Sequence, residues 1–345
     1  MQVNVAGVPG RGGRRHGCVI RRWSAVLRPF SMLGEVEGAV FDERVSIVLN
    51  KPGVDGLSEV VRVLREWQYD GAPLQLHPGD IGWYWRFGAE ATAAAIRTWS
   101  RDGRILAVGL LDGPDLVRLA IAPDAQNDEE LAQQMVADVT DPERGVLPRG
   151  SVSVEARSGA LFRGLLVENG WAADEPWTPL CRDLTDPVED CGVRIAVVGP
   201  ERARVRAAVQ RAAFDGSTFT DERWQAMAAG LPYADAQCLV AYDDQGNAVA
   251  AATVWSAGEW KPGLLEPMGV HRDHRGHGYG TAITVAAAAA LQGLGSSTAI
   301  VCTASSNVGA VATYKSAGFR ELPAVRDLRR SVPGAFLHTR HGDAT

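Results

Sequence analysis

A glycine-rich stretch, HRDHRGHGYGT at residues 271–281, lies between two apolar segments. LLEPMGV before it is typical of a strand, and AITVAAAAALQGLG after it is typical of a helix. Closely spaced glycines let backbone N–H groups approach an anion with no Cβ in the way. The helix N-terminus adds unpaired N–H donors and a partial positive charge. The order strand, glycine loop, helix therefore predicts a mixed α/β chain with a phosphate-binding loop.

Two familiar phosphate and metal motifs do not fit this stretch. A P-loop ends in Gly-Lys-Ser/Thr and a dinucleotide fingerprint reads GxGxxG, whereas this loop reads GxGxG and ends in Thr281. His271, His274 and His277 have a spacing like that of metal ligands. In a segment that passes from strand to loop they would not share one face, and no cysteine or carboxylate pair completes a ligand shell. We expect no metal.

Composition narrows the class of protein. The 345 residues suggest about two domains, and 46% hydrophobic residues suffice for sizeable cores. A net charge of −6 argues against a general nucleic-acid binder. No apolar run approaches the roughly 18 residues that cross a bilayer, so no membrane partner is expected. Five scattered cysteines without a CxxC motif indicate a reduced, cytoplasmic protein.

Changes in composition and turn-forming residues mark the expected domain boundaries. Residues 1–31 hold six arginines and no acid, which predicts a disordered basic tail, with Met32 as a candidate start. The segment DLTDPVEDCG ends one set of elements, so we expect domains at 40–188 and 192–330 and a C-terminal tail at 331–345.

The two expected domains can be laid over each other. Ile121 then falls on Val270, and Leu166 on Tyr314, at nearly the same offset. This favours an internal duplication. The alternative is two α/β domains with only generic similarity.

The pattern V-x-x-x-x-R-G-x-G-x-G-T from Val270 is followed by Asn307-x-x-Ala310-x-x-x-Tyr314-x-x-x-Gly318-Phe319. This pair of motifs resembles the GNAT-type N-acetyltransferase superfamily. The resemblance covers residues 193 to about 325. It implies two GNAT-like domains in tandem, each a central mixed sheet flanked by helices, with acetyl-CoA as co-substrate.

The resemblance also implies site residues. The pyrophosphate would lie on the glycine loop, and the pantetheine arm would pair with the strand edge at 268–270. The implied cofactor-binding residues are Met268, Gly269, Val270, Arg275, Gly276, His277, Gly278, Tyr279, Gly280, Thr281 and Asn307. Tyr314 would protonate the departing thiolate, because a phenol can give a proton to a thiolate. Arg272 stands where the family often has proline, a departure of small expected effect.

An amine must lose a proton before it attacks a thioester, so a base is needed. Glu266 is the candidate, because alternation along the strand would place it on the same face as Val270. A surface carboxylate or an anchor for the substrate ammonium is the alternative for Glu266. Asp243, Asp244 and Glu259 are weaker candidates, which turn or loop solvation would also explain.

The first domain lacks the phosphate loop. Gln126 stands in place of the arginine, and the acids of NDEE would repel a pyrophosphate. Leu166 replaces the tyrosine, and Gly159 replaces Asn307. We expect this half to bind no CoA, to pack on the catalytic half and to shape the acceptor site, with DIGWYWR (residues 80–86) near the interface.

The sequence thus favours an acyltransferase that moves an acetyl group from acetyl-CoA to a primary amine of a small molecule in a ternary complex. Tandem mycothiol-synthesis acetyltransferases and protein N-terminal acetyltransferases are alternatives within the same class. A CoA-binding sensor or interaction protein without turnover is an alternative from another class. Neither the acceptor nor the oligomeric state follows from the residues.

Overall fold

The structure, a computed structural model, describes residues 46–331. These residues belong to one compact unit, Val45–Thr345. The tail expected at 1–31, and all but the first residue of the tail expected at 331–345, lie outside the described residues. Within the described part, no helix is long and apolar enough to cross a membrane.

The elements up to residue 183 are called the N-terminal half. Its strands are β1 (Val48–Asn50), β2 (Ile96–Arg101), β3 (Arg104–Leu111), β4 (Leu116–Ile121), β5 (Val152–Glu155) and β6 (Ala172–Asp183). Its helices are α1 (Leu57–Glu66), α2 (Pro78–Tyr84), α3 (Ala89–Ala95), α4 (Glu129–Thr140) and α5 (Ala160–Glu168).

The elements from residue 194 onward are called the C-terminal half. Its strands are β7 (Arg194–Val197), β8 (Ala236–Tyr242), β9 (Ala248–Trp255), β10 (Pro262–Val270), β11 (Thr298–Ala304), β12 (Arg320–Glu321) and β13 (Val325–Arg330). Its helices are α6 (Ala203–Ala213), α7 (Asp221–Ala228), α8 (Tyr279–Gly293) and α9 (Val308–Ser316).

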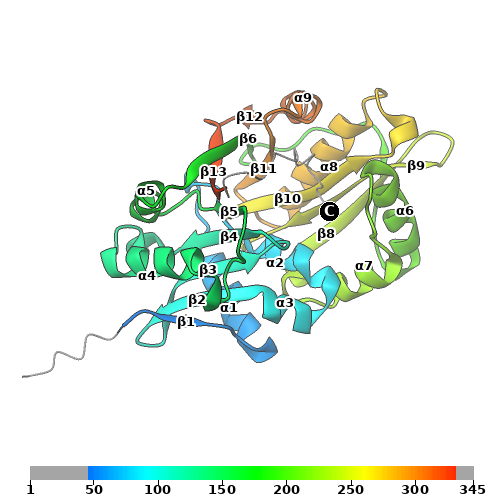
Figure 1. Cartoon of the computed structure of the whole chain (residues 1–345). Coiled ribbons are helices and arrows are strands. Elements are labelled where there is room, and N and C mark those ends of the chain that lie inside the picture. Colours follow the sequence, from blue (N-terminus) through cyan, green and yellow to red (C-terminus); the bar gives the residue numbers. More distant parts are fainter. Residues whose placement is uncertain (1–45, 332–345) are drawn as a thin grey trace, which may run out of the picture. The chain divides into compact units, whose positions relative to one another are not determined.

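All described strands join one mixed sheet, which helices flank (Figure 1). In the N-terminal half β2, β3 and β4 pair antiparallel, and β4 pairs parallel with β5. In the C-terminal half β8, β9 and β10 pair antiparallel, and β10 pairs parallel with β11. A helix, α4 or α8, connects the parallel pair in each half. The expected mixed α/β fold is confirmed, and both halves repeat one strand order.

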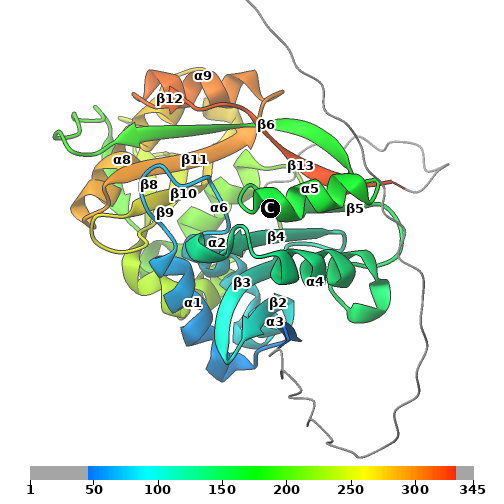
Figure 2. The same cartoon turned by 90° about the vertical axis from the view of Figure 1, so that its left-hand side faces the viewer.

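The last strand of each half pairs with the other half. β6 lies along β11 from Trp177↔Ala304 to Asp183↔Thr298, while β13 lies between β5 and β6 (Figure 2). The sheet is therefore continuous across the boundary that the sequence suggests at 188–192.

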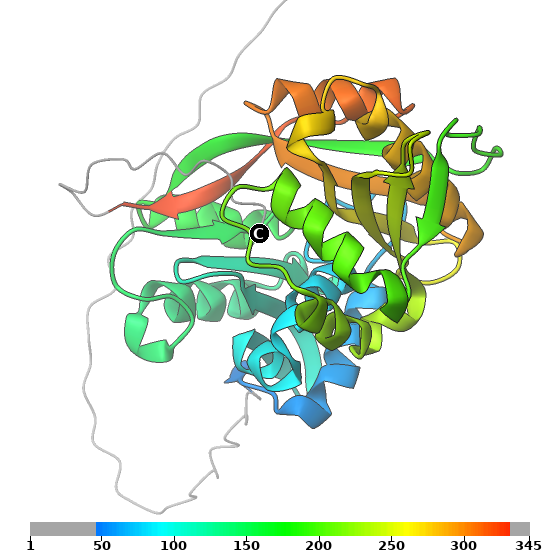
Figure 3. The same cartoon turned by 90° about the vertical axis from the view of Figure 1, so that its right-hand side faces the viewer.

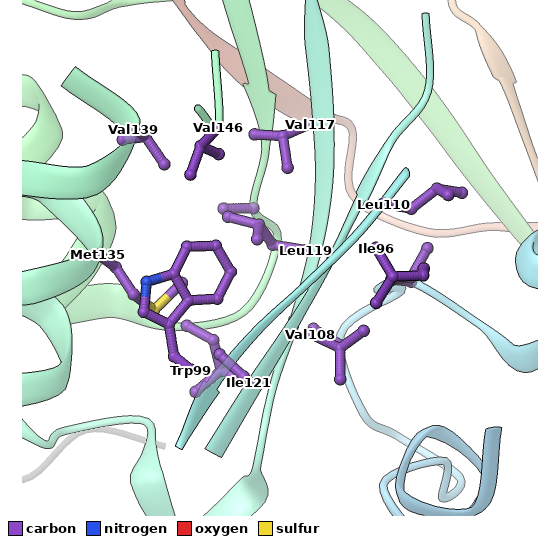
Figure 4. Packing of buried hydrophobic residues seen from close by; sticks show 14 of the residues in the cluster. Ile96, Trp99, Val108, Leu110, Val117, Leu119, Ile121, Met135, Val139 and Val146 are labelled. Carbon is purple, nitrogen blue, oxygen red and sulfur yellow. The ribbon is translucent and has the colours of Figure 1, made fainter. Parts of the chain in front are cut away.

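Three apolar clusters form the core. One fills the N-terminal half, where Trp99, Leu119 and Met135 pack between the sheet and α4 (Figure 4). In the C-terminal half, a second lies under α8 and a third under α6 and α7, on opposite faces of the sheet (Figure 3).

Helix α2 joins the halves. Trp83 belongs to the cluster under α6 and α7, where its ring stacks on Phe219 at 5.2 Å. A Cβ at Gly79 or Gly82 would fall 2.5 or 2.3 Å from Trp255, so only glycine allows this close approach. The expectation that DIGWYWR lies near the interface is confirmed.

Candidate active site

The end of β10 offers a free strand edge. The register of β10 with β11 ends at Leu264↔Ile300, while its pairing with β9 continues to Val270↔Ala250. The N–H of His271 bonds to the carbonyl of Val249, which makes Val270↔Ala250 a non-hydrogen-bonded pair. The N–H groups of Val270 and, by the same register, Met268 therefore face away from β9, toward the space that β11 has left.

A bulge changes the geometry just before this edge. The register of β10 with β9 shifts between Leu265 and Met268. Alternation does not carry across a bulge, so it cannot place Glu266 relative to Val270. Gly269 lies just after the bulge. Its Cβ would lie 2.6 Å from Ala213, so the glycine admits the end of α6.

The glycine loop has the shape of an anion cradle. Gly276 and Gly278 have φ of +81° and +83°, and a Cβ on either would meet no atom within 4 Å. Gly278 is the N-cap of α8, and the N–H of Ala282 bonds back to its carbonyl. The N–H groups of the preceding turn, through Gly280 and Thr281, have no partner within the helix. Their donors and the helix dipole suit a pyrophosphate.

Arg275 reaches away from the loop in this structure. Its Nη2 donates to the carbonyl oxygen of Ala213 at 2.7 Å, at the end of α6. The neighbouring Arg272, which stands where the family often has proline, donates to carbonyl oxygens of the same helix. Both arginines therefore fix the loop to α6.

The three histidines of the loop make ring contacts: His271 meets His274 edge to face, and His277 stacks on Tyr279. His271 and His274 have ring centroids 5.3 Å apart, and the His277 and Tyr279 rings stack at 6.2 Å. No group of three or more potential metal ligands exists among residues 46–331.

Helix α9 carries the other predicted residues. The side chain of Asn307 caps it by accepting from the N–H of Ala310 at 3.2 Å. Tyr314 is buried in the cluster that also contacts Met268 and Val270. Burial raises the pKa of Tyr314, and the nearby Glu266 raises it further. The phenol therefore stays protonated at neutral pH and can donate a proton.

Glu266 lies at the meeting point of the two halves. Its Oε1 is 3.8 Å from Nη1 of Arg118, which projects from β4 of the N-terminal half. The same guanidinium pairs with Asp80 at 2.9 Å, Glu155 at 3.1 Å and Asp112 at 3.5 Å. Burial alone would lower the pKa of Arg118, but these carboxylates raise it well above its usual range. These five residues are called the Arg118 cluster.

The weaker candidates for a base occupy turns. The side chain of Asp243 accepts from the N–H groups of Gln245 and Asn247, at 3.0 and 2.7 Å, and so fixes the β8–β9 hairpin. Asp244 and Glu259 are exposed on the loops that follow β8 and β9. Glu266 is the candidate whose charge acts on Tyr314.

In the N-terminal half, the chain itself occupies the edge that is free in β10. The N–H of Leu76 donates to the carbonyl of Leu119 on β4 at 3.3 Å, and the N–H of Ile121 donates to Oε1 of Gln75 at 3.4 Å. Ile121 is the residue that the sequence comparison lays on Val270. The segment at 75–76 thus fills the position where the C-terminal half could hold an extended ligand.

The loop before α4 is closed as well. Gln126 donates to the carbonyl of Ile121 at 2.8 Å and accepts from the N–H of Gly159. Asp128 caps α4 by accepting from the N–H of Leu131 at 2.9 Å, and Arg101 pairs with Asp128 at 2.6 Å. Side chains therefore take the donors that the glycine loop leaves free in the other half.

Sequence reasoning missed His77, Asp80 and Arg118. His77 and Asp80 form a capping box at the start of α2, with Pro78 at the first helical position. The letters HPGD carry that signal, since a capping pair three apart with proline between is typical of a helix start. Nothing local to Arg118 marks it, because its partners come from four separate segments.

The comparisons with known proteins agree with this geometry. Residues 206–319 match the model of the acetyltransferase (GNAT) family. Residues 206–319, in the C-terminal half, therefore carry a domain of the acetyltransferase (GNAT) family. None of the curated proteins matches the chain.

Solved structures share the fold over most of the chain. A tandem GNAT protein from the clavulanic acid biosynthesis pathway is 14% identical with a TM-score of 0.55, covering 83% of this chain and 98% of its own. A GNAT-family acetyltransferase from Colwellia psychrerythraea is 18% identical with a TM-score of 0.52, covering 82% and 98%. A GCN5-related N-acetyltransferase from Sphaerobacter thermophilus, also 18% identical, has a TM-score of 0.50 and covers 82% and 95%. At these identities the likeness shows the fold alone.

Proposed function

We propose that the chain is an acetyl-CoA-dependent N-acetyltransferase that acetylates a primary amine of a small molecule by direct attack in a ternary complex. The observation that carries the proposal is the free edge of β10, which leads into a glycine loop at the N-terminus of α8. Together these features fit both parts of one ligand, an extended amide chain and a pyrophosphate.

The residues of the donor side have separate tasks. The N–H of Met268 would pair with a pantetheine amide, as a strand pairs with a sheet edge. The N–H groups of the loop from Gly276 to Thr281 would bind the pyrophosphate. Asn307 would use its free amide group on the same ligand while its oxygen caps α9. Acetyl-CoA supplies the activated acyl group.

The chemistry then needs one base and one acid. Glu266 takes a proton from the ammonium form of the acceptor, which becomes the neutral nucleophile. The new bond joins its nitrogen to the acyl carbon while the carbon–sulfur bond breaks. The N–H of Val270 stabilises the negative charge on the acyl oxygen. Tyr314 gives its proton to the thiolate. The attacking nitrogen loses its second proton to solvent, and solvent reprotonates Tyr314.

Only the C-terminal half is proposed to bind CoA. In the N-terminal half, Gln75 and Leu76 already occupy the strand edge, and Gln126 bridges the loop to α5. The repeated strand order supports an origin by duplication, with the ligand site lost from the first copy. The cysteines of residues 46–331 are free, which fits the reduced cytoplasm that we propose as the location.

Isothermal calorimetry of the full chain with acetyl-CoA tests the donor side. We expect one site per chain. Two sites would show that the N-terminal half also binds, and no binding would remove the enzyme proposal.

Release of CoA thiol across a panel of small primary amines tests turnover. We expect release with at least one amine. Binding of acetyl-CoA without turnover on small amines or on peptide N-termini would favour a sensor, whereas activity confined to peptides would favour a protein N-terminal acetyltransferase.

A further inference from the structure

The carboxylates of the Arg118 cluster fall into two classes. Asp80 and Glu155 are buried and lie closest to the guanidinium, at 2.9 and 3.1 Å. Asp112 and Glu266 have about one third of their side chains exposed, 34% and 33%, and lie farther from it, at 3.5 and 3.8 Å. Asp80 and Glu155 neutralise Arg118 at short range. Asp112 and Glu266 interact with it more weakly and can therefore bind another cation.

Buried polar atoms beside this cluster have no hydrogen-bond partner within residues 46–331. They are Oε1 of Glu155, Nε of Arg157 and Oδ1 of Asp327. The side chains are 9%, 3% and 10% exposed. Nε of Arg157 faces Oδ1 of Asp327 across 3.9 Å, too far for a direct hydrogen bond. Because buried polar groups are almost always bonded, a polar group from outside the chain is expected there.

The site also holds more acid than base. Burial raises the pKa of Asp80 well above its usual range although Arg118 opposes it, and Glu266 and Glu155 raise it further. Burial and Glu155 raise the pKa of Asp327 to about 7. Burial is the main cause of both raised pKa values, and the neighbouring carboxylates add to it. Arg86 also faces Asp112 and Glu266, whose charges favour its protonated form. A bound ammonium would relieve this repulsion.

We propose that the Arg118 cluster is the acceptor site, that it takes a small polar primary amine as its ammonium, and that Asp112 of the N-terminal half holds this ammonium beside Glu266. The inference rests on the proposed function and adds the chemical class of the acceptor and a specificity residue from the half without a CoA loop. Asp112 binds, and Glu266 takes the proton. Hydroxyl groups of the acceptor meet the unpartnered atoms near Arg157.

Binding of amines to the full chain saturated with CoA tests the proposal without any turnover. Saturation-transfer NMR would use ethanolamine and 2-amino-1,3-propanediol as polar ammonium probes, propylamine as an apolar amine and ethylene glycol as an uncharged control. We expect the two polar amines to bind more tightly than propylamine, and ethylene glycol not to bind. Equal binding of all four, or no binding of the polar amines by a chain that binds CoA, would overturn the proposal.

Asp112→Asn is the decisive variant. We expect it to weaken the binding of the polar amines about 10-fold, the size of one lost ionic hydrogen bond. The affinity for CoA should be unchanged. Asp112→Glu, which keeps the charge, should retain most of the affinity. Asp124→Asn is the matched control, because Asp124 is an exposed acid of the same half that pairs only with Arg104 among the described residues.

Turnover, where it is seen, separates binding from proton transfer. Asp112→Asn should raise KM for the amine about 10-fold with kcat nearly unchanged. Full amine affinity and wild-type KM in Asp112→Asn would show that Asp112 is a surface acid. A chain that binds amines through Asp112 but never releases CoA thiol would refute the proposed function and leave this site standing.

Discussion

Trp255 donates a hydrogen bond from Nε1 to the carbonyl oxygen of Glu266 at 2.7 Å, and the indole ring is covered by α2 of the other half. One aromatic side chain thus links the bulge that carries the proposed base to a helix far away in sequence. A substitution that disturbs the packing of α2 on Trp255 should therefore also displace Glu266.

Gly82→Ala tests this link. The new Cβ would lie 2.3 Å from Cζ3 of Trp255, so the ring must move. We expect a loss of about 1–3 kcal/mol in the free energy of unfolding, as for other overpacked cores, together with a lower kcat. Urea unfolding and steady-state kinetics measure the two effects. Gly164→Ala is the control, since its Cβ meets open space on α5 and helix propensity predicts a gain of about 0.5–1 kcal/mol.

Gly278→Glu should abolish CoA binding. The substitution places a carboxylate at the cradle and requires a left-handed φ that glycine adopts at +83° without strain. Calorimetry with CoA measures the loss. Gly293→Glu puts the same side chain at the other, exposed end of α8 and should leave affinity intact. Unchanged affinity in Gly278→Glu would remove the loop from the CoA site.

Tyr314→Phe should lower kcat and leave the affinity for acetyl-CoA nearly unchanged. The proposed role of the hydroxyl group is to protonate the thiolate, and its raised pKa keeps it protonated before the reaction. Thiol release gives kcat, and calorimetry gives the affinity. Tyr242→Phe, a tyrosine that stacks with Arg194 on the edge of the sheet, is the control. A wild-type kcat would leave Tyr314 as a packing residue.

Glu266→Gln should reduce kcat about 100-fold, within the usual range for a general base. The amide keeps the size of the side chain but cannot take the proton. Stopped-flow measurement of thiol release follows the step directly. Glu259→Gln, on the exposed β9–β10 loop, should behave as wild type. Equal activity in the two variants would reassign the base.

His77 predicts a dependence of stability on pH. Burial lowers its pKa to about 3 from the usual 6.5, and its Nε2 lies 3.2 Å from the carbonyl of Pro262. Below pH 6.5 the His77 side chain binds a proton in the unfolded chain but stays neutral in the folded chain. The contribution of His77 is therefore complete above pH 6.5 and falls as the pH drops toward 3, by up to about 5 kcal/mol.

The measurement is urea unfolding of wild type and His77→Asn from pH 7.5 to 4. We expect the difference between the two to shrink as the pH falls. His274→Asn, in the loop before α8, should show no such trend. A difference that stays constant with pH would mean that His77 matters only as a cap.

The residues proposed to bind acetyl-CoA could be predicted from the sequence because they lie in short sequence motifs. Gly276, Gly278 and Gly280 mark the loop, and Asn307 and Tyr314 lie one short helix apart.

The Arg118 cluster, proposed as the acceptor site, could not be predicted from the sequence, because long-range pairing creates it. Arg118 and Asp80 meet Glu266 only after α2 has docked on Trp255. The exchange of β6 and β13 likewise depends on which strand edges remain free once both halves form. The bulge in β10 defeated the alternation argument, since a shift of register leaves no mark in the polar pattern.

The occupied edge of β4 has a consequence for regulation. The segment of Gln75 and Leu76 is tethered to its own binding position, so its effective concentration there is fixed by the length of the chain. By the proposed function, the C-terminal half would instead gain stability from bound CoA, as the logarithm of the free CoA concentration above Kd. By the proposed function, the N-terminal half would need no metabolite to complete its sheet edge, and it would hold the proposed acceptor site in shape when no donor is bound.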